Sequence, residues 1–282
     1  MLPDTLKGIG QYAFAGCTGL TAFTIPDSVT TLDTNAFKGC SNLETITIGS
    51  SVTKLNNNMF EGCSKLNNVT IPANVTSLGK NTFKDCVGLT DLTIEGNVRG
   101  TNGGAFSGCS ALDTVTIGSG VTSIGNYLFQ NHAALTSVTI PEGVTELGEF
   151  AFSNCTLLDD VIIPDTVTSL GTNAFNGCTA LNNVTIGTGL AAIAEYTFAQ
   201  CPSLTEIILP DNIISVGMSA FIGTWQSNAW VGENLNKITL GADVTFDGDT
   251  FGTARNTLKT TYAAEAGGAG TYTFADGSWS KE

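Results

Sequence analysis

Apolar and polar residues recur along this chain with a period of 23 residues. Each period opens with a leucine, carries an isoleucine five positions later and places a phenylalanine 17 positions after the leucine. The phenylalanine column consists of Phe14, Phe37, Phe60, Phe83, Phe106, Phe129, Phe152, Phe175, Phe198 and Phe221. Self-similarity at a fixed spacing of this length is typical of repeat proteins, in which each repeat forms one structural unit. The pattern therefore predicts a single elongated array.

Each period contains two extended segments. The pattern L-x-x-[VI]-x-I alternates with period two, which indicates a strand, and the proline or glycine that follows ends it. A second apolar pair, V-x-x-[LI]-G, leads to [AT]-F-x-x-C, which has room for an extended piece and a tight turn. A coil of this kind buries its apolar face only against its neighbours. We therefore expect a β-rich, right-handed, curved solenoid of about 10 to 11 coils, with a parallel sheet on its concave face.

The same pattern sets the expected boundaries. Residues 1–256 should form one solenoid that starts in mid-repeat, because Leu2-Pro3 aligns with Ile25-Pro26, and this start leaves the first coil uncapped. We expect the chain to be a piece of a longer array. The leucine due 23 residues after Leu204 stands at Leu235, so eight residues are inserted within 222–234. The period fades after residue 251, and residues 257–282 should form a C-terminal cap with a hairpin turning on Asp276-Gly277.

The full unit, L-x-x-[IV]-x-I-P-x-x-V-x-x-[IL]-G-x-x-A-F-x-x-C, resembles the 23-residue leucine-rich repeat of BspA-type bacterial surface proteins. The match covers about residues 2–252. The resemblance implies a horseshoe-like solenoid that is secreted or held on a bacterial cell surface and is used for adhesion to host proteins or other cells.

A column of cysteines also follows the repeat. The cysteines are Cys17, Cys40, Cys63, Cys86, Cys109, Cys155, Cys178 and Cys201, and His132 stands where a ninth would fall. A metal site would need Cys109, His132 and Cys155 to converge on one centre, whereas a column of successive coils places them in a line. Parallel side chains are also poorly oriented for disulfides. We expect buried, reduced thiols that act as small hydrophobic groups and weak donors to backbone carbonyls, with His132 marking a coil where the slot opens to solvent.

Composition argues against several classes of function. With one histidine and no P-loop, zinc-protease, calcium-loop or dinucleotide motif, the chain is expected to have no enzymatic activity, cofactor or metal site. The 25 acidic and 11 basic residues give a net charge of −14, which repels nucleic-acid phosphates and anionic lipid. No apolar run is long enough to insert into a membrane. Cations and basic protein surfaces stay possible partners.

The candidate ligand-binding residues lie at the outward positions of the strands and in the insertion that interrupts the repeat. Outward strand positions carry a threonine ladder that is interrupted by Ile162 and Ile208. Acidic residues on the same face are expected in register: Asp91, Asp113, Asp159, Asp160 and Glu206. The insertion contributes Trp225 and Trp230, either as exposed anchors or as a lid over the last coils. Threonine is in any case a good exposed strand residue, so the ladder is open to a purely structural reading as well.

Two functions fit these features. The first is a non-enzymatic adhesion or interaction module that binds a protein or glycan of a host or another cell through the solenoid face. The alternative is a spacer or scaffold that presents another domain of a longer surface protein. We expect a monomer, with end-to-end association possible at the uncapped N-terminal coil.

Overall fold

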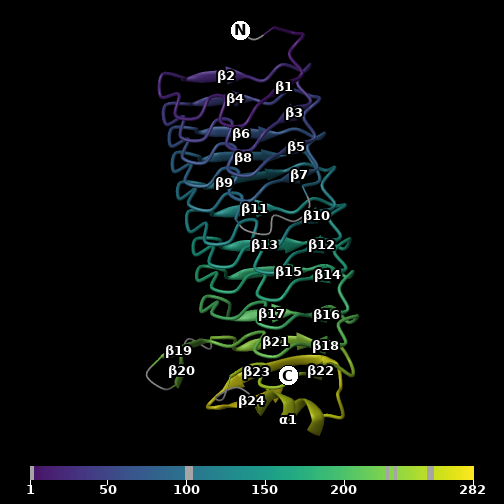
Figure 1. Cartoon of the computed structure of the whole chain (residues 1–282). Coiled ribbons are helices and arrows are strands. Elements are labelled where there is room, and N and C mark those ends of the chain that lie inside the picture. The colour runs from purple at the N-terminus through teal and green to yellow at the C-terminus, as the bar shows by residue number, and fades with distance from the viewer. Residues whose placement is uncertain (1–2, 99–103, 227–228, 232–233, 253–256) are drawn as a thin grey trace.

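The structure is a computed structural model that describes residues 3–98, 104–226, 229–231, 234–252 and 257–282, with the backbone alone described for 224–226 and 229–231. Each 23-residue period forms one coil, and the coils stack into an elongated β-solenoid (Figure 1). The predicted β-rich solenoid is confirmed. One short helix, α1 (Thr257–Ala264), lies among the described residues.

The first extended segment of each period forms one wall of the solenoid, here called the long-strand face. Its first eight strands form one parallel sheet. They are β2 (Ala22–Thr24), β4 (Thr45–Thr47), β6 (Asn68–Ile71), β8 (Asp91–Ile94), β9 (Thr114–Ile117), β11 (Ser137–Thr139), β13 (Asp160–Ile163) and β15 (Asn183–Ile186). Each strand pairs with the residues one period away, as Asn68 pairs with Asp91 and Asp91 with Thr114. The 23-residue pattern therefore sets the register directly.

The long-strand face is interrupted once in the described residues. Beyond β15 the next strand is β17 (Glu206–Ile208), which is not paired with β15 but starts a second sheet. In this second sheet β17 pairs in parallel with β21 (Lys237–Leu240), which pairs with the antiparallel strand β23 (Gly270–Ala275), followed by β24 (Ser278–Lys281). The interruption thus lies one coil before the insertion.

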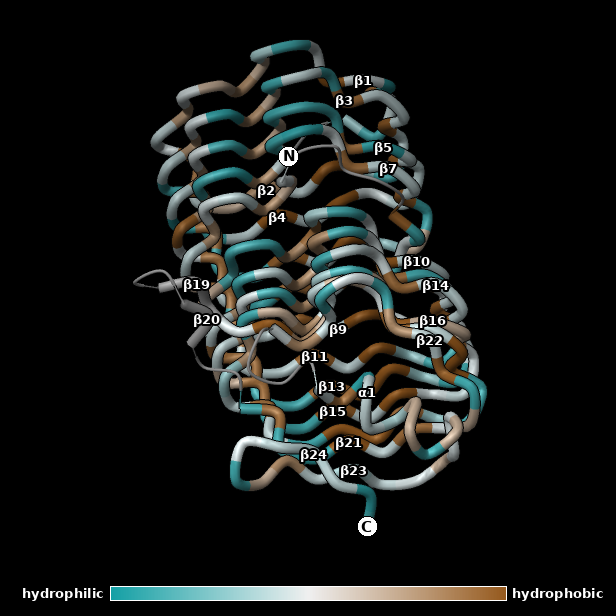
Figure 2. The backbone as a smooth tube through the Cα atoms, turned by 90° about the horizontal axis from the view of Figure 1, so that it is seen from below, coloured by the Kyte–Doolittle hydropathy of each residue, from teal (hydrophilic) through white to brown (hydrophobic). Residues whose placement is uncertain are grey.

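The second extended segment forms a wall of two-residue strands, the short-strand face. These strands are β1 (Gly8–Ile9), β3 (Thr31–Leu32), β5 (Lys54–Leu55), β7 (Ser77–Leu78), β10 (Ser123–Ile124), β12 (Glu146–Leu147), β14 (Ser169–Leu170), β16 (Ala192–Ile193), β18 (Ser215–Val216) and β22 (Thr245–Phe246). Turns complete each coil and still bond between coils, since Phe37 N donates to Met59 O at 3.0 Å. Figure 2 shows the hydrophobic segments recurring at equivalent places in successive coils.

The phenylalanine column forms the spine of the core. Its rings stack face to face along the whole array, with centroids 5.1 to 6.3 Å apart and Phe251 extending the column by one coil. The largest spacing lies between Phe106 and Phe129. Stacked rings of this kind add to the stabilisation that burial alone provides, so each coil is held by its two neighbours.

The insertion adds a separate antiparallel hairpin, β19 (Thr224–Gln226) and β20 (Ala229–Val231). In Figure 1 this hairpin stands at the side of the stack, next to the coil of β21. Its strands pair with each other and with no other described strand.

The C-terminal residues cover the last coil. The hairpin predicted at Asp276-Gly277 is present, since β23 and β24 flank these two residues and both have positive φ angles, 52° and 80°. The helix α1 was not predicted, and it brings Tyr262 under the last coil, where the hydroxyl donates to Gly241 O at 2.8 Å. Tyr262 is 4 % exposed, Tyr272 0 % and Trp279 4 %. This end of the core is therefore covered.

The N-terminal coil is covered less completely. Leu6, Phe14, Leu20 and Phe23 are half-buried, whereas Phe37 in the next coil is fully buried. A hollow of about 980 Å³ opens beside Leu20 and Phe23. The two ends of the solenoid thus differ in how well they shield the core.

Candidate functional site

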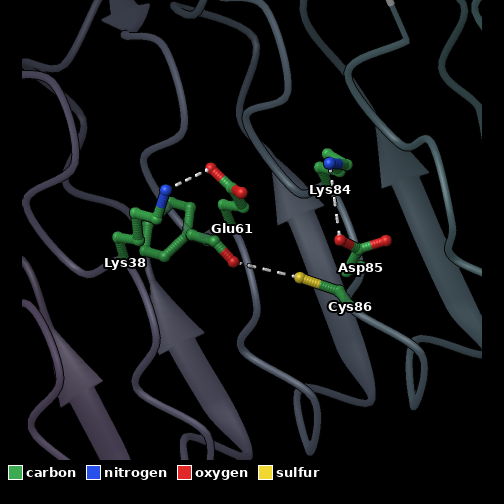
Figure 3. A network of polar contacts seen from close by, with 6 residues as sticks. Lys38, Glu61, Lys84, Asp85 and Cys86 are labelled. Atoms are coloured by element: carbon green, nitrogen blue, oxygen red, sulfur yellow. Dashed lines mark hydrogen bonds and ion pairs between the residues drawn. The ribbon is translucent and has the colours of Figure 1, made fainter.

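The cysteine column is a repeated structural slot. All eight cysteines are free thiols and seven are buried. Each buried thiol donates to the carbonyl of the phenylalanine 26 residues earlier, at 3.0 to 3.3 Å. Figure 3 shows one of these bonds at Cys86, with the ion pairs Lys38–Glu61 (2.9 Å) and Lys84–Asp85 (3.6 Å) on the surface nearby. The structural reading of the column is confirmed for these seven residues.

His132 performs the same role with an imidazole. It is 3 % exposed, so the expectation that the slot opens to solvent here is wrong. Its Nε2 lies 3.1 Å from Phe106 O, the carbonyl that a cysteine would use. Because a carbonyl only accepts, Nε2 carries the proton, and Nδ1 has no partner among the described residues. The neighbouring step of the phenylalanine stack, from Phe106 to Phe129, is the widest of the column.

The thiol of Cys17 is not buried, so the expectation of buried thiols is wrong at this position. It is exposed, because its slot lies in the first coil and no preceding coil covers it. Deeper in the array, burial raises the pKa of the Cys155 and Cys201 thiols to about 12, since a thiolate would lose its hydration there. The thiols of Cys155 and Cys201 are therefore neutral and unreactive at physiological pH.

The described residues contain no group of three or more His, Cys, Asp or Glu side chains placed to hold a metal ion. Within the same residues, no helix has the length and apolar character needed to cross a membrane.

The threonine ladder is exposed on the long-strand face, and the two isoleucines that interrupt it are exposed with it. Ile162 is 58 % exposed and Ile208 is 67 % exposed. Ile162 lies in register with Thr185, and Ile208 with Thr239. Both large apolar side chains therefore face outward in a row that otherwise carries threonine.

The acidic residues of this face do not form a single row. Asp91, Asp160 and Glu206 share one register position, but Thr114, Ser137 and Asn183 stand between them. Asp113 and Asp159 occupy the position just before it. The expected in-register acidic column is thus wrong, because acidic and neutral residues alternate along the stack and keep carboxylates from adjoining coils at one position. Neighbouring hydroxyls also stabilise two of these carboxylates, since Thr90 Oγ1 donates to Asp91 Oδ2 at 2.7 Å and Thr114 Oγ1 donates to Asp113 Oδ1 at 3.0 Å.

A hollow of about 540 Å³ opens on the long-strand face where β15 and β17 fail to pair. It is lined by Asn182, Asn183, Val184, Thr185, Ile186, Glu206, Ile207, Ile208, Pro210, Lys237, Thr239 and Thr271. Of the candidate residues, Glu206 and Ile208 line this hollow, whereas Asp91, Asp113, Asp159, Asp160 and Ile162 lie outside it. Sequence reasoning missed Lys237 and Thr271. Lys237 falls opposite Glu206 once the insertion is subtracted, but nothing in the repeat marks Thr271.

Of the two charged residues that line the hollow, Lys237 forms an ion pair and Glu206 does not, among the described residues. Lys237 Nζ lies 3.3 Å from Glu282 Oε1, and Thr273 Oγ1 donates to the same oxygen at 2.6 Å. The hydrogen bond from Thr273 and the Lys237 ammonium lower the pKa of the Glu282 carboxyl. Glu206 lies in register with Lys237 but forms no ion pair in the described part of the chain. The carboxylate of Glu206 is therefore open to a ligand.

Trp225 and Trp230 lie opposite each other in the hairpin β19–β20. Their side chains lie outside the described residues. Their role as exposed anchors or as a lid therefore stays a prediction.

These features define a parallel-strand β-solenoid of the leucine-rich-repeat type. The family model of the BspA type leucine rich repeat region matches residues 1–113 and 122–246, and the chain belongs to this family. The resemblance found in the repeat unit is thereby confirmed.

Solved structures are similar to this chain. A leucine-rich repeat protein from Bacteroides ovatus is 25% identical with a TM-score of 0.51, over 86% of this chain and 79% of that one. A leucine rich cell surface protein from Faecalibacterium prausnitzii is 30% identical with a TM-score of 0.48, over 88% of this chain and 70% of that one. A comparison with curated proteins finds no match.

Proposed function

We propose that this chain is a non-enzymatic interaction module, secreted or held on a bacterial cell surface, that binds a protein or glycan of a host or another cell through its long-strand face. One observation carries the proposal. Two large apolar side chains, Ile162 and Ile208, are exposed on a face whose other outward positions in the same row are threonines. The family membership supports a surface location, as the BspA-type resemblance implies.

The architecture suits recognition of a large partner. A solenoid presents a continuous array of side chains at a fixed spacing, and such extended surfaces are what repeat proteins use for binding. Contiguous exposed apolar patches rimmed by polar residues mark interaction sites, and Ile162 and Ile208 lie two coils apart in one row of this face. The candidate contact residues are Asp91, Asp113, Asp159, Asp160, Ile162, Glu206 and Ile208 on the face, with Trp225 and Trp230 at its side. We propose that the chain acts as a monomer that can associate end to end through the N-terminal coil.

A binding screen followed by footprinting tests this function. The purified chain is exposed to immobilised host matrix proteins and to a glycan array, and hydrogen exchange then maps the amides that a bound partner protects. We expect protection in β13, β15, β17 and β21. A footprint confined to the short-strand face would overturn the proposed binding face.

The spacer alternative makes a different prediction. Removing residues 112–134, which amount to one period, should leave a spacer functional, because only its length changes slightly. A recognition module should lose affinity when the deletion shifts coils that a partner contacts together. The deletion variant is therefore measured beside the intact chain on each partner found.

A further inference from the structure

We propose that the hollow between β15 and β17 binds the side chain of a lysine or arginine carried by an extended segment of a protein partner. The inference rests on the proposed function and specifies the chemistry of the partner. Three independent features of the hollow point to it: an interrupted backbone ladder, an exposed aliphatic surface and a carboxylate without an ion pair.

The backbone pairing between neighbouring long strands is interrupted at the hollow. The strands β13 and β15 pair in parallel, and so do β17 and β21, but β15 and β17 do not pair within the described residues. The short-strand face stays intact at the same level, since β16 pairs with β18. The opening is therefore confined to the long-strand face, where an extended partner segment can lie across the outward side of the strands.

The aliphatic part of the hollow includes Ile208. Its side chain is 67 % exposed at the rim, between Thr185 and Thr239 in the same row. A lysine or arginine stem can cover this apolar surface while its charged end stays in contact with polar groups or water. A purely polar ligand would leave Ile208 in water.

The charge of the hollow selects a cation. The Glu206 carboxylate is exposed and has no ion pair among the described residues, while the ammonium of Lys237 is engaged by Glu282. The whole chain carries a net charge of −14, which attracts basic partners over the Debye length. Anionic segments are repelled by the same field, and a neutral glycan would leave the carboxylate unpaired.

The test uses short peptides as probes. An acetylated, amidated peptide of alternating lysine and serine is titrated into the full chain and followed by NMR chemical shifts. A second peptide replaces lysine with 2,4-diaminobutyrate, which keeps the charge on a shorter stem. We expect the lysine peptide to bind more tightly and to shift signals of β15, β17 and β21.

The chain itself offers matched controls. Glu206→Gln is compared with Asp91→Asn, since both residues share one register position and only Glu206 lines the hollow. Ile208→Thr is compared with Ile162→Thr, and both changes restore the usual residue of the row, so folding is preserved. We expect Glu206→Gln to weaken peptide binding about threefold or more, Ile208→Thr about three- to tenfold, and the two controls to change it little.

Equal effects of Glu206→Gln and Asp91→Asn, with no effect of Ile208→Thr, would show general attraction to an acidic surface and overturn the inference. Equal affinity for the two peptides would do the same. If a partner from the binding screen protects amides of the long-strand face but the lysine peptide does not bind, the inference is rejected and the proposed function stands. Peptide binding with the expected variant pattern, but no macromolecule on this face, would reject the proposed function alone.

Discussion

A single hydrogen bond, from a thiol to the carbonyl of the preceding coil, is repeated at seven cysteines. The same carbonyl also accepts the backbone N–H three residues later in its own coil, as Phe60 O does from Cys63 N at 3.1 Å, so the thiol adds a second hydrogen bond to it. A typical hydrogen bond contributes about 0.5 to 1.5 kcal/mol. The imidazole of His132 makes the same second bond. The slot therefore accommodates a donor of modest size, and two chemically different residues fill it.

Thiol accessibility follows from this arrangement. A thiol reagent should modify one cysteine of the native protein, Cys17, and all eight after denaturation, because the other seven are buried. Mass spectrometry of the labelled protein identifies the site. As a control, Cys17→Ser should abolish native labelling without changing the thermal unfolding temperature. Rapid native labelling of two or more cysteines would contradict the buried column.

Alkaline pH should destabilise the fold through the same thiols. The pKa values of Cys155 and Cys201 are raised from 9.0 to about 12 in the folded protein. Between pH 9 and 12 the unfolded chain releases these protons while the folded chain keeps them, so stability falls as pH rises. The slope is up to about 1.4 kcal/mol per pH unit for each thiol. Denaturant unfolding between pH 8 and 10.5 measures it, and Cys155→Ala with Cys201→Ala should give a flatter profile; an unchanged slope would contradict this account.

Turn residues with positive φ angles provide another prediction at this scale. One turn position has φ between 53° and 62° at Asn35, Asn58, Asn81 and Asn173, and aromatic residues replace asparagine in other coils. Tyr127 and Phe150 recover part of the conformational cost by stacking, with centroids 5.1 Å apart. Tyr196 has φ 55° and no stacked ring among the described residues. Tyr196→Asn should therefore raise stability by about 0.5 to 1 kcal/mol.

The control for this turn prediction is Phe150→Asn, which gains the same backbone preference but loses the stacked ring. It should change stability little or lower it. Both variants are compared by denaturant unfolding, and a loss of stability in Tyr196→Asn would contradict the argument from backbone conformation.

The secondary structure elements that the repeat or a local turn signal determines could be predicted from the sequence. The register of the long strands follows from the 23-residue spacing, and the Asp276-Gly277 hairpin follows from local turn preference. The missing pairing between β15 and β17 does not follow from the sequence, because no residue of the repeat pattern marks it. The acidic row was misjudged because a shift of one position, as from Asp159 to Asp160, places a residue in a different row. Helix α1 lies outside the repeat and has no strong periodic signal.

The hairpin β19–β20 is the element whose role a mutation can decide. If Trp225 and Trp230 are anchors, Trp225→Ala with Trp230→Ala should weaken binding to a partner found in the screen by about 2 kcal/mol or more, independently of salt. Asp159→Asn with Asp160→Asn should instead weaken binding at low salt, because exposed charges are screened over about 8 to 10 Å at physiological ionic strength. Lower thermal stability with unchanged affinity in the tryptophan pair would identify the hairpin as a lid.

At the scale of the whole molecule, stability is distributed along the array. In a solenoid each coil contacts mainly its neighbours, so the total is close to a sum of coil and interface contributions. The large interior of the array is continuous from Ile9 to Trp279. The two ends are unequal, because the last coil is covered by α1 and β24 whereas Phe14 and Phe23 of the first are half-buried. Loss of residues should therefore have different consequences at each end.

Truncation tests this asymmetry. Deleting residues 257–282 removes Tyr262, Tyr272 and Trp279 from the last coil and exposes Phe246 and Phe251, whose rings lie 5.6 Å from Tyr262 and 6.5 Å from Trp279, respectively. We expect a lower unfolding temperature, binding of a hydrophobic dye and aggregation seen by light scattering. Deleting residues 1–20 removes one weakly covered coil and leaves an end much like the original, so stability should fall little. In the intact chain, amides of the first coil should exchange earlier than those of β21 and β23. Equal tolerance to both deletions would contradict the role of the C-terminal residues as a cap. Burial of three large aromatic side chains at the last coil would then contribute no more to stability than the weakly covered first coil does.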